Sequence, residues 1–131
     1  MTDSPWEFFS LEELRCKCGE CKSTGGEMNP DFMQKIVALR KTLGFPFIVA
    51  SAYRCGLHNA QVSGTGTKGP HTTGKAMDIS TRGEQAWLLL HAAYDHGISG
   101  VGVSQKGLSR FIHLDDCDDS DGLPRPMVWS Y

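Results

Sequence analysis

The segment from Gly69 to Ile79 constrains the fold of this chain more than any other stretch. It reads Gly-Pro-His-Thr-Thr-Gly-Lys-Ala-Met-Asp-Ile and places His71 and Asp78 seven residues apart. Pro70 and Gly74 disfavour one helix running through both positions. A loop at Gly74 would instead let the chain fold back, so that His71 and Asp78, the latter at the start of a strand, converge. An imidazole nitrogen and a carboxylate oxygen are both good zinc ligands.

A second segment, from Phe111 to Asp115, has the pattern of a strand. Side chains alternate along a strand, so His113 and Asp115 share one face while Ile112 and Leu114 enter the core. Two residues along a strand are roughly 6.5–7 Å apart. This spacing suits a metal ligand beside an acid that can reach metal-bound water.

Three side chains, His71, Asp78 and His113, could therefore supply protein ligands and leave a fourth position open, as in catalytic zinc sites. The alternative is that His113 is a hydrogen-bonded histidine of the sheet and Asp115 an acid in a turn.

The remaining pattern predicts helices and strands without a strict βαβ alternation. Capping patterns at 10–13, 29–30 and 81–84 predict helix starts, and Gly44 and Gly97 predict helix ends. Phe32 and Trp87 are expected to face the core. Strands are expected at 45–50, 75–80, 98–104, 110–114 and, as a terminal edge, 124–129. We expect an α+β fold with a small, mostly antiparallel sheet flanked by two main helices.

The length of 131 residues predicts one domain over residues 1–131. The net charge is −2, and the 13 basic residues are spread along the chain. Without a basic stripe, nucleic acid is not an expected partner. The longest apolar stretch, 86–93, is too short to span a bilayer, so we expect no membrane insertion. A monomer is expected.

Four motifs occur in a fixed order: Ser51-Ala-Tyr-Arg54, His58-Asn59, the His71 to Asp78 segment, and His113-x-Asp115. Together they resemble the zinc D-alanyl-D-alanine carboxypeptidase family, which includes vancomycin-resistance dipeptidases and phage endolysins and shares its fold with the hedgehog signalling domain. The closing segment 125–131 resembles the tails of short phage-type members. The resemblance covers residues 9–131.

This resemblance implies a hedgehog/DD-peptidase fold, a zinc cofactor and a substrate among the stem or cross-link peptides of peptidoglycan. It implies that zinc is bound by His71, Asp78 and His113. It also implies that Arg54 faces the substrate or the developing oxyanion, and that Ser51 and Tyr53 bind substrate.

Two positions depart from the family pattern. Many members have Ser two residues before the first ligand histidine, where this chain has Gly69. Many carry their catalytic acid three residues before the last histidine, where this chain has Arg110. Arginine stays protonated and cannot act as a base. We therefore expect Asp115 to be the catalytic base, whereas Asp116 should point the other way.

The five cysteines are an odd number, which argues against a fully disulfide-bonded domain. A structural zinc ion could be held by Cys16, Cys18, Cys21 and Cys55. A disulfide to Cys55 and free thiols are the alternatives. Cys117 is expected to be an unpaired surface thiol.

Three kinds of function fit these observations: a cell-wall peptidase, a zinc-containing binding module without turnover, and a phage structural component. The N-terminus lacks a basic region followed by an apolar run, so no secretory signal is expected. Such a protein would be synthesised in the cytoplasm and would act on the cell wall if released, as phage lysins do.

Overall fold

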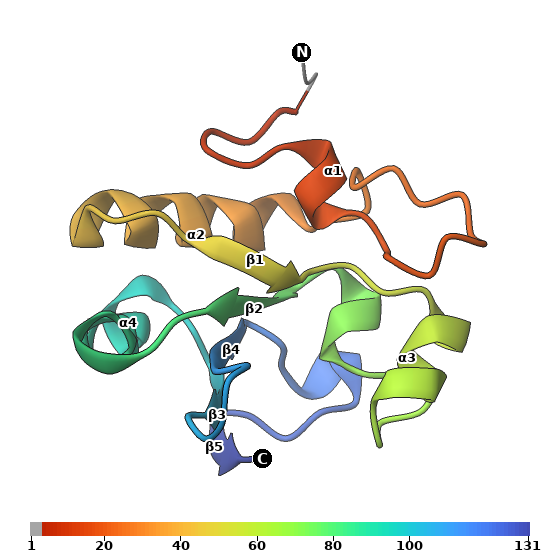
Figure 1. The fold of residues 1–131 in the computed structure, drawn as a ribbon. Coiled ribbons are helices and arrows are strands. Elements are labelled where there is room, and N and C mark those ends of the chain that lie inside the picture. Colours follow the sequence, from red (N-terminus) through yellow and green to blue (C-terminus); the bar gives the residue numbers. More distant parts are fainter. Residues whose placement is uncertain (1–3) are drawn as a thin grey trace.

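A five-stranded sheet forms the centre of the computed structural model, which describes residues 4–131 (Figure 1). The strands lie in the order β1-β2-β4-β3-β5. Three neighbouring pairs are antiparallel, and β3 pairs with β5 in parallel. The strands are β1 (Ile48–Ser51), β2 (Ala76–Ser80), β3 (Gly100–Ser104), β4 (Phe111–Asp115) and β5 (Met127–Ser130). The expected α+β fold with a mostly antiparallel sheet is confirmed.

Among residues 4–131, four α-helices and three short 3₁₀ turns precede or connect the strands. The helices are α1 (Leu11–Leu14), α2 (Pro30–Leu43), α3 (Gly56–Val62) and α4 (Gly83–Ala93). The 3₁₀ turns are η1 (Pro70–Thr73), η2 (Tyr94–His96) and η3 (Asp119–Asp121). The two main helices, α2 and α4, contact each other, and α3 lies at the far end of β1 (Figure 1).

Helix α2 follows its sequence signals. The side chain of Asn29 accepts a hydrogen bond from the backbone N–H of Phe32, and Pro30 occupies the first turn. Gly44 ends the helix in the left-handed conformation, at φ 77°. The apolar face, including Phe32, Ile36 and Leu39, is fully buried.

Helix α4 differs from its expected start. The cap position is Arg82, which makes no side-chain capping bond, and the buried hydroxyl of Thr81 has no hydrogen-bond partner among the described residues. The predicted capping box at Thr81 is therefore wrong. The buried residues of α4 are Ala86, Leu89 and Ala93, and this helical spacing turns Trp87 outwards, where it is 69% exposed.

The strand expected at 45–50 forms only in part, over Ile48–Ser51, and it is not buried. Strand β1 begins at Ile48 and pairs only with β2, so it is an edge strand. Ile48 is 65% exposed, and the buried residue of this segment is Phe47, which precedes the strand.

The central strand β4 is buried on both of its faces. Ile112 and Leu114 join the hydrophobic core, as expected, while His113 and Asp115 are also buried on the opposite face. In the β2–β4 pair, Asp78 lies directly opposite His113. Directly opposed residues of an antiparallel pair have their Cβ atoms about 4.5–5.5 Å apart, so the sheet register alone brings these two side chains together.

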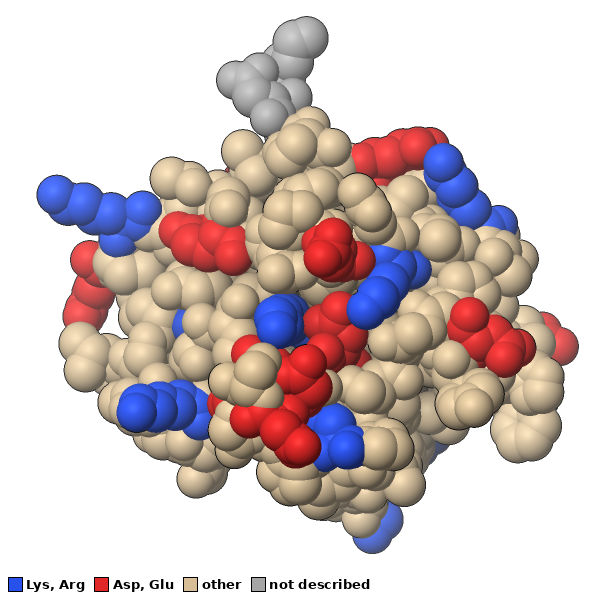
Figure 2. All heavy atoms as spheres, turned by 180° about the vertical axis from the view of Figure 1, so that it is seen from behind, with Lys and Arg blue, Asp and Glu red and all other residues tan. Residues whose placement is uncertain are grey.

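Acidic and basic side chains are close neighbours on the surface. Figure 2 shows the face behind that of Figure 1, where acidic side chains gather near the middle with basic side chains beside them. Two ion pairs involve the acidic stretch after β4: Lys35 with Asp116 at 2.8 Å and Lys75 with Asp121 at 3.1 Å.

Within residues 4–131, the helices are all too short or too polar to traverse a bilayer. The expectation of no secretory signal depends partly on residues 1–3, which lie outside the described residues.

Candidate metal centre

Three side chains from separate parts of the chain meet on the face of the sheet opposite Ile112 and Leu114. Asp78 comes from β2, His113 from β4 and His71 from the 3₁₀ turn η1. Their nearest ligand atoms all lie within 4.8 Å of one another. Asp78 Oδ1 lies 3.2 Å from His71 Nε2 and 2.9 Å from His113 Nδ1. The structure thus brings together the three residues that the sequence analysis selected as zinc ligands.

The turn at Gly74 delivers His71 to this position. Gly74 adopts φ 76° and ends η1, and a Cβ added there would lie 2.3 Å from the carbonyl oxygen of Glu27. Glycine is therefore required both by the left-handed backbone and by the close approach. The carbonyl of His71 accepts a hydrogen bond from the backbone N–H of Arg54, which fixes η1 against the segment after β1.

Hydrogen bonds fix which nitrogen of His71 faces the cluster. Its Nδ1 lies 2.6 Å from the carbonyl oxygen of Ala52, which can only accept, so Nδ1 carries the proton. Nε2 of the neutral ring then directs a lone pair at a carboxylate oxygen of Asp78. Two such lone pairs repel unless a cation lies between them.

The donor set fits a zinc ion. Zinc bonds of about 2.0–2.1 Å in a tetrahedron place neighbouring ligand atoms about 3.3 Å apart, close to the two separations measured around Asp78 Oδ1. Two imidazoles and one carboxylate also match a catalytic zinc site, in which a fourth position is kept for water or substrate.

Asp115 lies behind His113, on the side of the ring away from this cluster. Its Oδ2 accepts from His113 Nε2 at 2.7 Å, and His113 presents the other nitrogen, Nδ1, to Asp78. Arg125 binds both carboxylate oxygens of Asp115, at 2.9 and 2.8 Å. Asp115 is fully buried. A carboxylate that orients a metal-binding histidine in this way is a common feature of zinc sites.

This position does not support the expected role of Asp115 as a base. Burial alone would raise the pKa of its carboxyl group, but hydrogen bonds with His113 and Arg125 outweigh burial and lower it to about 2. A carboxylate so firmly held as an anion has little tendency to accept a proton. Both of its oxygens are already hydrogen-bonded within the protein.

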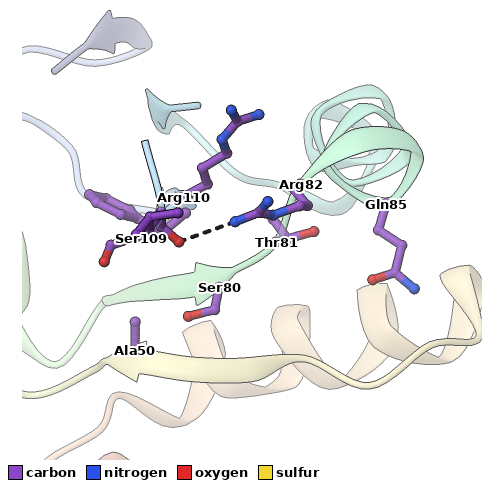
Figure 3. Close-up of a pocket in the computed structure, with 9 residues that line it drawn as sticks. Ala50, Ser80, Thr81, Arg82, Gln85, Ser109 and Arg110 are labelled. Carbon is purple, nitrogen blue, oxygen red and sulfur yellow. Dashed lines mark hydrogen bonds between the residues drawn. The ribbon is translucent and has the colours of Figure 1, made fainter. Parts of the chain in front are cut away.

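Asp116, and Arg110 at the position where many family members carry their catalytic acid, both lie away from the cluster. Asp116 pairs with Lys35 of α2, on the other side of the sheet, as its alternation predicted. Arg110 lines a separate pocket of about 570 Å³ between β2 and the start of α4 (Figure 3). In that pocket Arg82 donates a hydrogen bond to the carbonyl of Leu108, and the lining includes no histidine, cysteine or carboxylate.

A larger pocket of about 770 Å³ opens onto the three converging side chains. Ser51 and Arg54 line it, as expected for substrate-binding residues. Tyr53 does not; it packs against the hydrophobic core.

Arg54 is held close to the cluster. Its guanidinium lies 3.6 Å from Asp78 Oδ2, and its buried Nε has no hydrogen-bond partner among the described residues. Burial lowers the pKa of Arg54, yet arginine remains charged under all ordinary conditions. The side chain therefore carries a cation with an unused donor beside the pocket.

The C-terminal tail forms one wall of the pocket by strand alternation. Arg125, Met127, Trp129 and Tyr131 all line the pocket, whereas Val128 is 70% exposed on the outer side. Opposite the tail, a Cβ at Gly102 of β3 would lie 2.6 Å from the indole nitrogen of Trp129. A residue without a side chain there allows the indole to lie across β3, 5.1 Å from the ring of His113.

The loop between α3 and η1 forms the opposite wall. Asn59 is buried and donates hydrogen bonds to Thr65 Oγ1 and to the carbonyl of Gly66, at 2.8 and 2.6 Å. A Cβ at Gly69 would lie 2.2 Å from Thr65 Oγ1. The threonine hydroxyl thus occupies the space that a serine at position 69 would need, which accounts for one of the two departures from the family pattern.

Sequence reasoning missed the roles of Arg125, Trp129 and His58. In the sequence, the segment 125–131 shows only a resemblance to the tails of other family members. No local pattern links Arg125 to the carboxylate of Asp115, ten positions earlier. His58 lines the pocket, and its buried Nδ1 has no partner among the described residues.

The cysteines divide into a cluster and one separate residue. The cluster consists of Cys16, Cys18, Cys21 and Cys55, whose sulfur atoms all lie within 4.8 Å of one another. Cys117 is 1% exposed, so the expected surface thiol is wrong. Its neighbours in sequence are acidic, but Cys117 itself turns inwards, with Thr73 Oγ1 at 3.8 Å.

A family model described as Peptidase M15 matches residues 7–115. A search of curated proteins finds no match.

Proposed function

The chain belongs to the Peptidase M15 family, and on that premise we propose that it is a zinc-dependent peptidase that hydrolyses the stem or cross-link peptides of peptidoglycan. The reaction would be of the D-Ala-D-Ala carboxypeptidase or endopeptidase type. The observation that carries this proposal is the convergence of His71, Asp78 and His113 beside a pocket large enough for a peptide.

These three side chains are the proposed zinc ligands. Zinc at such a site supplies Lewis acidity and lowers the pKa of water towards neutrality, which is the chemistry that peptide hydrolysis requires. The protein contributes the orientation of the ligands. Ala52 holds the ring of His71 through Nδ1, and Asp115 holds the ring of His113 through Nε2.

Arg54 is the proposed group for substrate recognition and charge stabilisation. Its unused donor and fixed charge beside Asp78 suit a peptide carboxylate or the negative oxygen that develops during hydrolysis. Loss of one donor to such an oxygen typically costs about 100- to 1,000-fold in rate. Ser51, on the same segment, would contact the bound peptide.

Asp115 is proposed as a positioning residue in place of the base expected from the sequence. Its contacts with His113 and Arg125 support this role. The pocket lining contains Asp78 but no other carboxylate.

That lining also favours a second candidate function, a zinc-containing binding module that does not turn over its ligand. The absence of a free carboxylate among the described lining residues is the observation that supports it. Both candidates use the same three ligands, and they differ in whether a peptide bond is broken.

Digestion of purified peptidoglycan separates the two. The zinc-loaded protein is incubated with sacculi, and the released fragments are identified by mass spectrometry. We expect D-alanine or cleaved cross-link peptides as products, no product after treatment with a chelator, and recovery when zinc is restored. The His71→Ala variant, checked for folding by circular dichroism, is the control. Binding of the zinc-loaded protein to sacculi without any product would support the binding module instead.

A further inference from the structure

A second group of potential metal ligands lies outside the peptidase site. Three of its cysteines follow α1 in the chain, and the fourth directly precedes α3. Cys55 Sγ lies 3.7 Å from Cys16 Sγ and 3.9 Å from Cys18 Sγ. None of the four forms a disulfide.

These separations discriminate among the three states considered for the cysteines. A disulfide requires sulfur atoms about 2.05 Å apart. Zinc bonded to four sulfurs at about 2.3 Å in a tetrahedron places neighbouring sulfurs about 3.8 Å apart. The two measured separations agree with the tetrahedron and not with the disulfide. Unrelated free thiols have no reason to gather four at one point.

Backbone N–H groups point at the sulfurs, as in sites that hold thiolates. Cys18 Sγ accepts from the N–H groups of Glu20 and Cys21, at 3.4 and 3.3 Å. Cys16 Sγ accepts from the N–H of Cys55, and Cys55 Sγ from the N–H of His58, both at 3.4 Å. Donors directed at a sulfur favour its charged form, and such outer contacts also orient metal ligands.

We propose that a structural zinc ion is bound by Cys16, Cys18, Cys21 and Cys55. A complete set of four protein sulfurs leaves no position for water, which is typical of structural rather than catalytic zinc. Thiolate ligands in a tetrahedral arrangement select zinc over the hard ions calcium and magnesium. This site shares no ligand with the proposed peptidase centre, and its metal binding can be tested without peptidase activity.

The ion would join two distant segments of the chain. Cys55 lies next to Arg54, and a backbone hydrogen bond from Tyr53 to Leu14 already links the same two segments at 3.1 Å. A metal bound there would therefore hold the Arg54 wall of the pocket against the loop that follows α1. Its loss should loosen Arg54 without touching the ligands of the peptidase site.

The experiment measures metal in the untagged 131-residue chain carrying His71→Ala. This change disrupts the peptidase site and leaves all four cysteines intact. We expect the variant to retain about one zinc ion per chain, with an X-ray absorption spectrum showing only sulfur neighbours at about 2.3 Å. A variant without zinc, or with zinc bound to nitrogen and oxygen, would overturn the proposal.

Cysteine variants give an independent test. Cys21 is exposed, so Cys21→Ser is the substitution least disruptive to folding, and it should remove the sulfur-bound zinc while the nitrogen- and oxygen-bound zinc remains. The matched control is Cys117→Ser, at the one cysteine outside the cluster, which should keep both ions. If Cys21→Ser fails to fold, the result with His71→Ala still decides. Alkylation of the denatured, unreduced chain at fewer than its five thiols would reveal a disulfide and would also contradict the proposal.

Discussion

At the scale of single residues, the pair of Asp115 and Arg125 fixes the ring of His113 in the candidate metal centre. Strand alternation correctly placed Asp115 on the same face as His113. It could not reveal that Arg125 would bind both oxygens of the carboxylate, because that contact depends on where the tail returns to the sheet. The carboxylate of Asp115, predicted from the sequence to be the base, instead accepts hydrogen bonds from His113 and Arg125.

Replacing Asp115 by Asn tests this assignment. The amide keeps the shape but loses the charge that orients His113, and losses of this kind typically weaken metal binding by about 10- to 100-fold. Zinc affinity is measured by competition with a chromogenic chelator. The matched control is Asp116→Asn, at a neighbouring carboxylate that pairs with Lys35 instead, and it should bind zinc as the unchanged chain does. Unaltered zinc affinity in the Asp115 variant, together with lost turnover, would instead support Asp115 as the catalytic base.

Replacing Arg125 by Gln should be costly for stability. It leaves the fully buried Asp115 carboxylate without its cation, and breaking a buried pair in this way typically costs about 3–5 kcal/mol. Urea unfolding measures the change in the free energy of unfolding. Arg110→Gln, in the separate pocket, should change it by no more than about 0.5 kcal/mol. Equal effects of the two substitutions would show that the Asp115 contact does not matter.

At the scale of helices, strands and loops, local signals were more reliable than expectations about strand pairing, although the capping box at Thr81 was wrong. Helix α2 could be predicted to the residue because Asn29, Pro30 and Gly44 act on their own neighbours. The edge position of β1 and the parallel pairing of β5 could not, since both depend on which strands meet after folding. The three proposed ligands were found because each follows a local pattern, and the Asp78–His113 register then brought two of them together.

The loop between α3 and η1 offers a test at this scale. Gly69→Ser introduces the residue that many family members carry, but its Cβ would meet Thr65 Oγ1. We expect the single change to destabilise the protein and Thr65→Ala to relieve the clash in the double variant. A double-mutant cycle of unfolding free energies should show coupling of about 0.5–3 kcal/mol. Additive effects would mean that the two side chains do not compete for the same space.

At the scale of the whole molecule, residues 4–131 share one hydrophobic cluster, which includes Phe32 of α2, Leu89 of α4 and Ile112 of β4. We therefore propose that the chain folds as one domain. The segment 51–55 contacts both candidate metal sites, because the carbonyl of Ala52 binds His71 and Cys55 belongs to the cysteine cluster. Metal content and the stability of the fold should therefore be linked.

This linkage predicts that zinc raises the melting temperature. An ion that binds only the folded state, at 100 times its dissociation constant, adds about 2.7 kcal/mol. Calorimetry of the chain with and without zinc measures the shift. His71→Ala should keep part of the shift, through the cysteine site, and a complete loss of it in that variant would count against two sites. A melting temperature that zinc does not alter in the unchanged chain would contradict the linkage itself.

The indole of Trp129, 5.1 Å from the ring of His113, gives the protein an optical probe of its own. Of the other two tryptophans, Trp87 is exposed on α4 and Trp6 packs against the core near the N-terminus. An ion or a peptide arriving at the pocket should therefore change the emission of one indole while the other two report a constant background. Loading of the site can thus be followed in real time without any attached dye, and a Trp129→Phe chain supplies the blank.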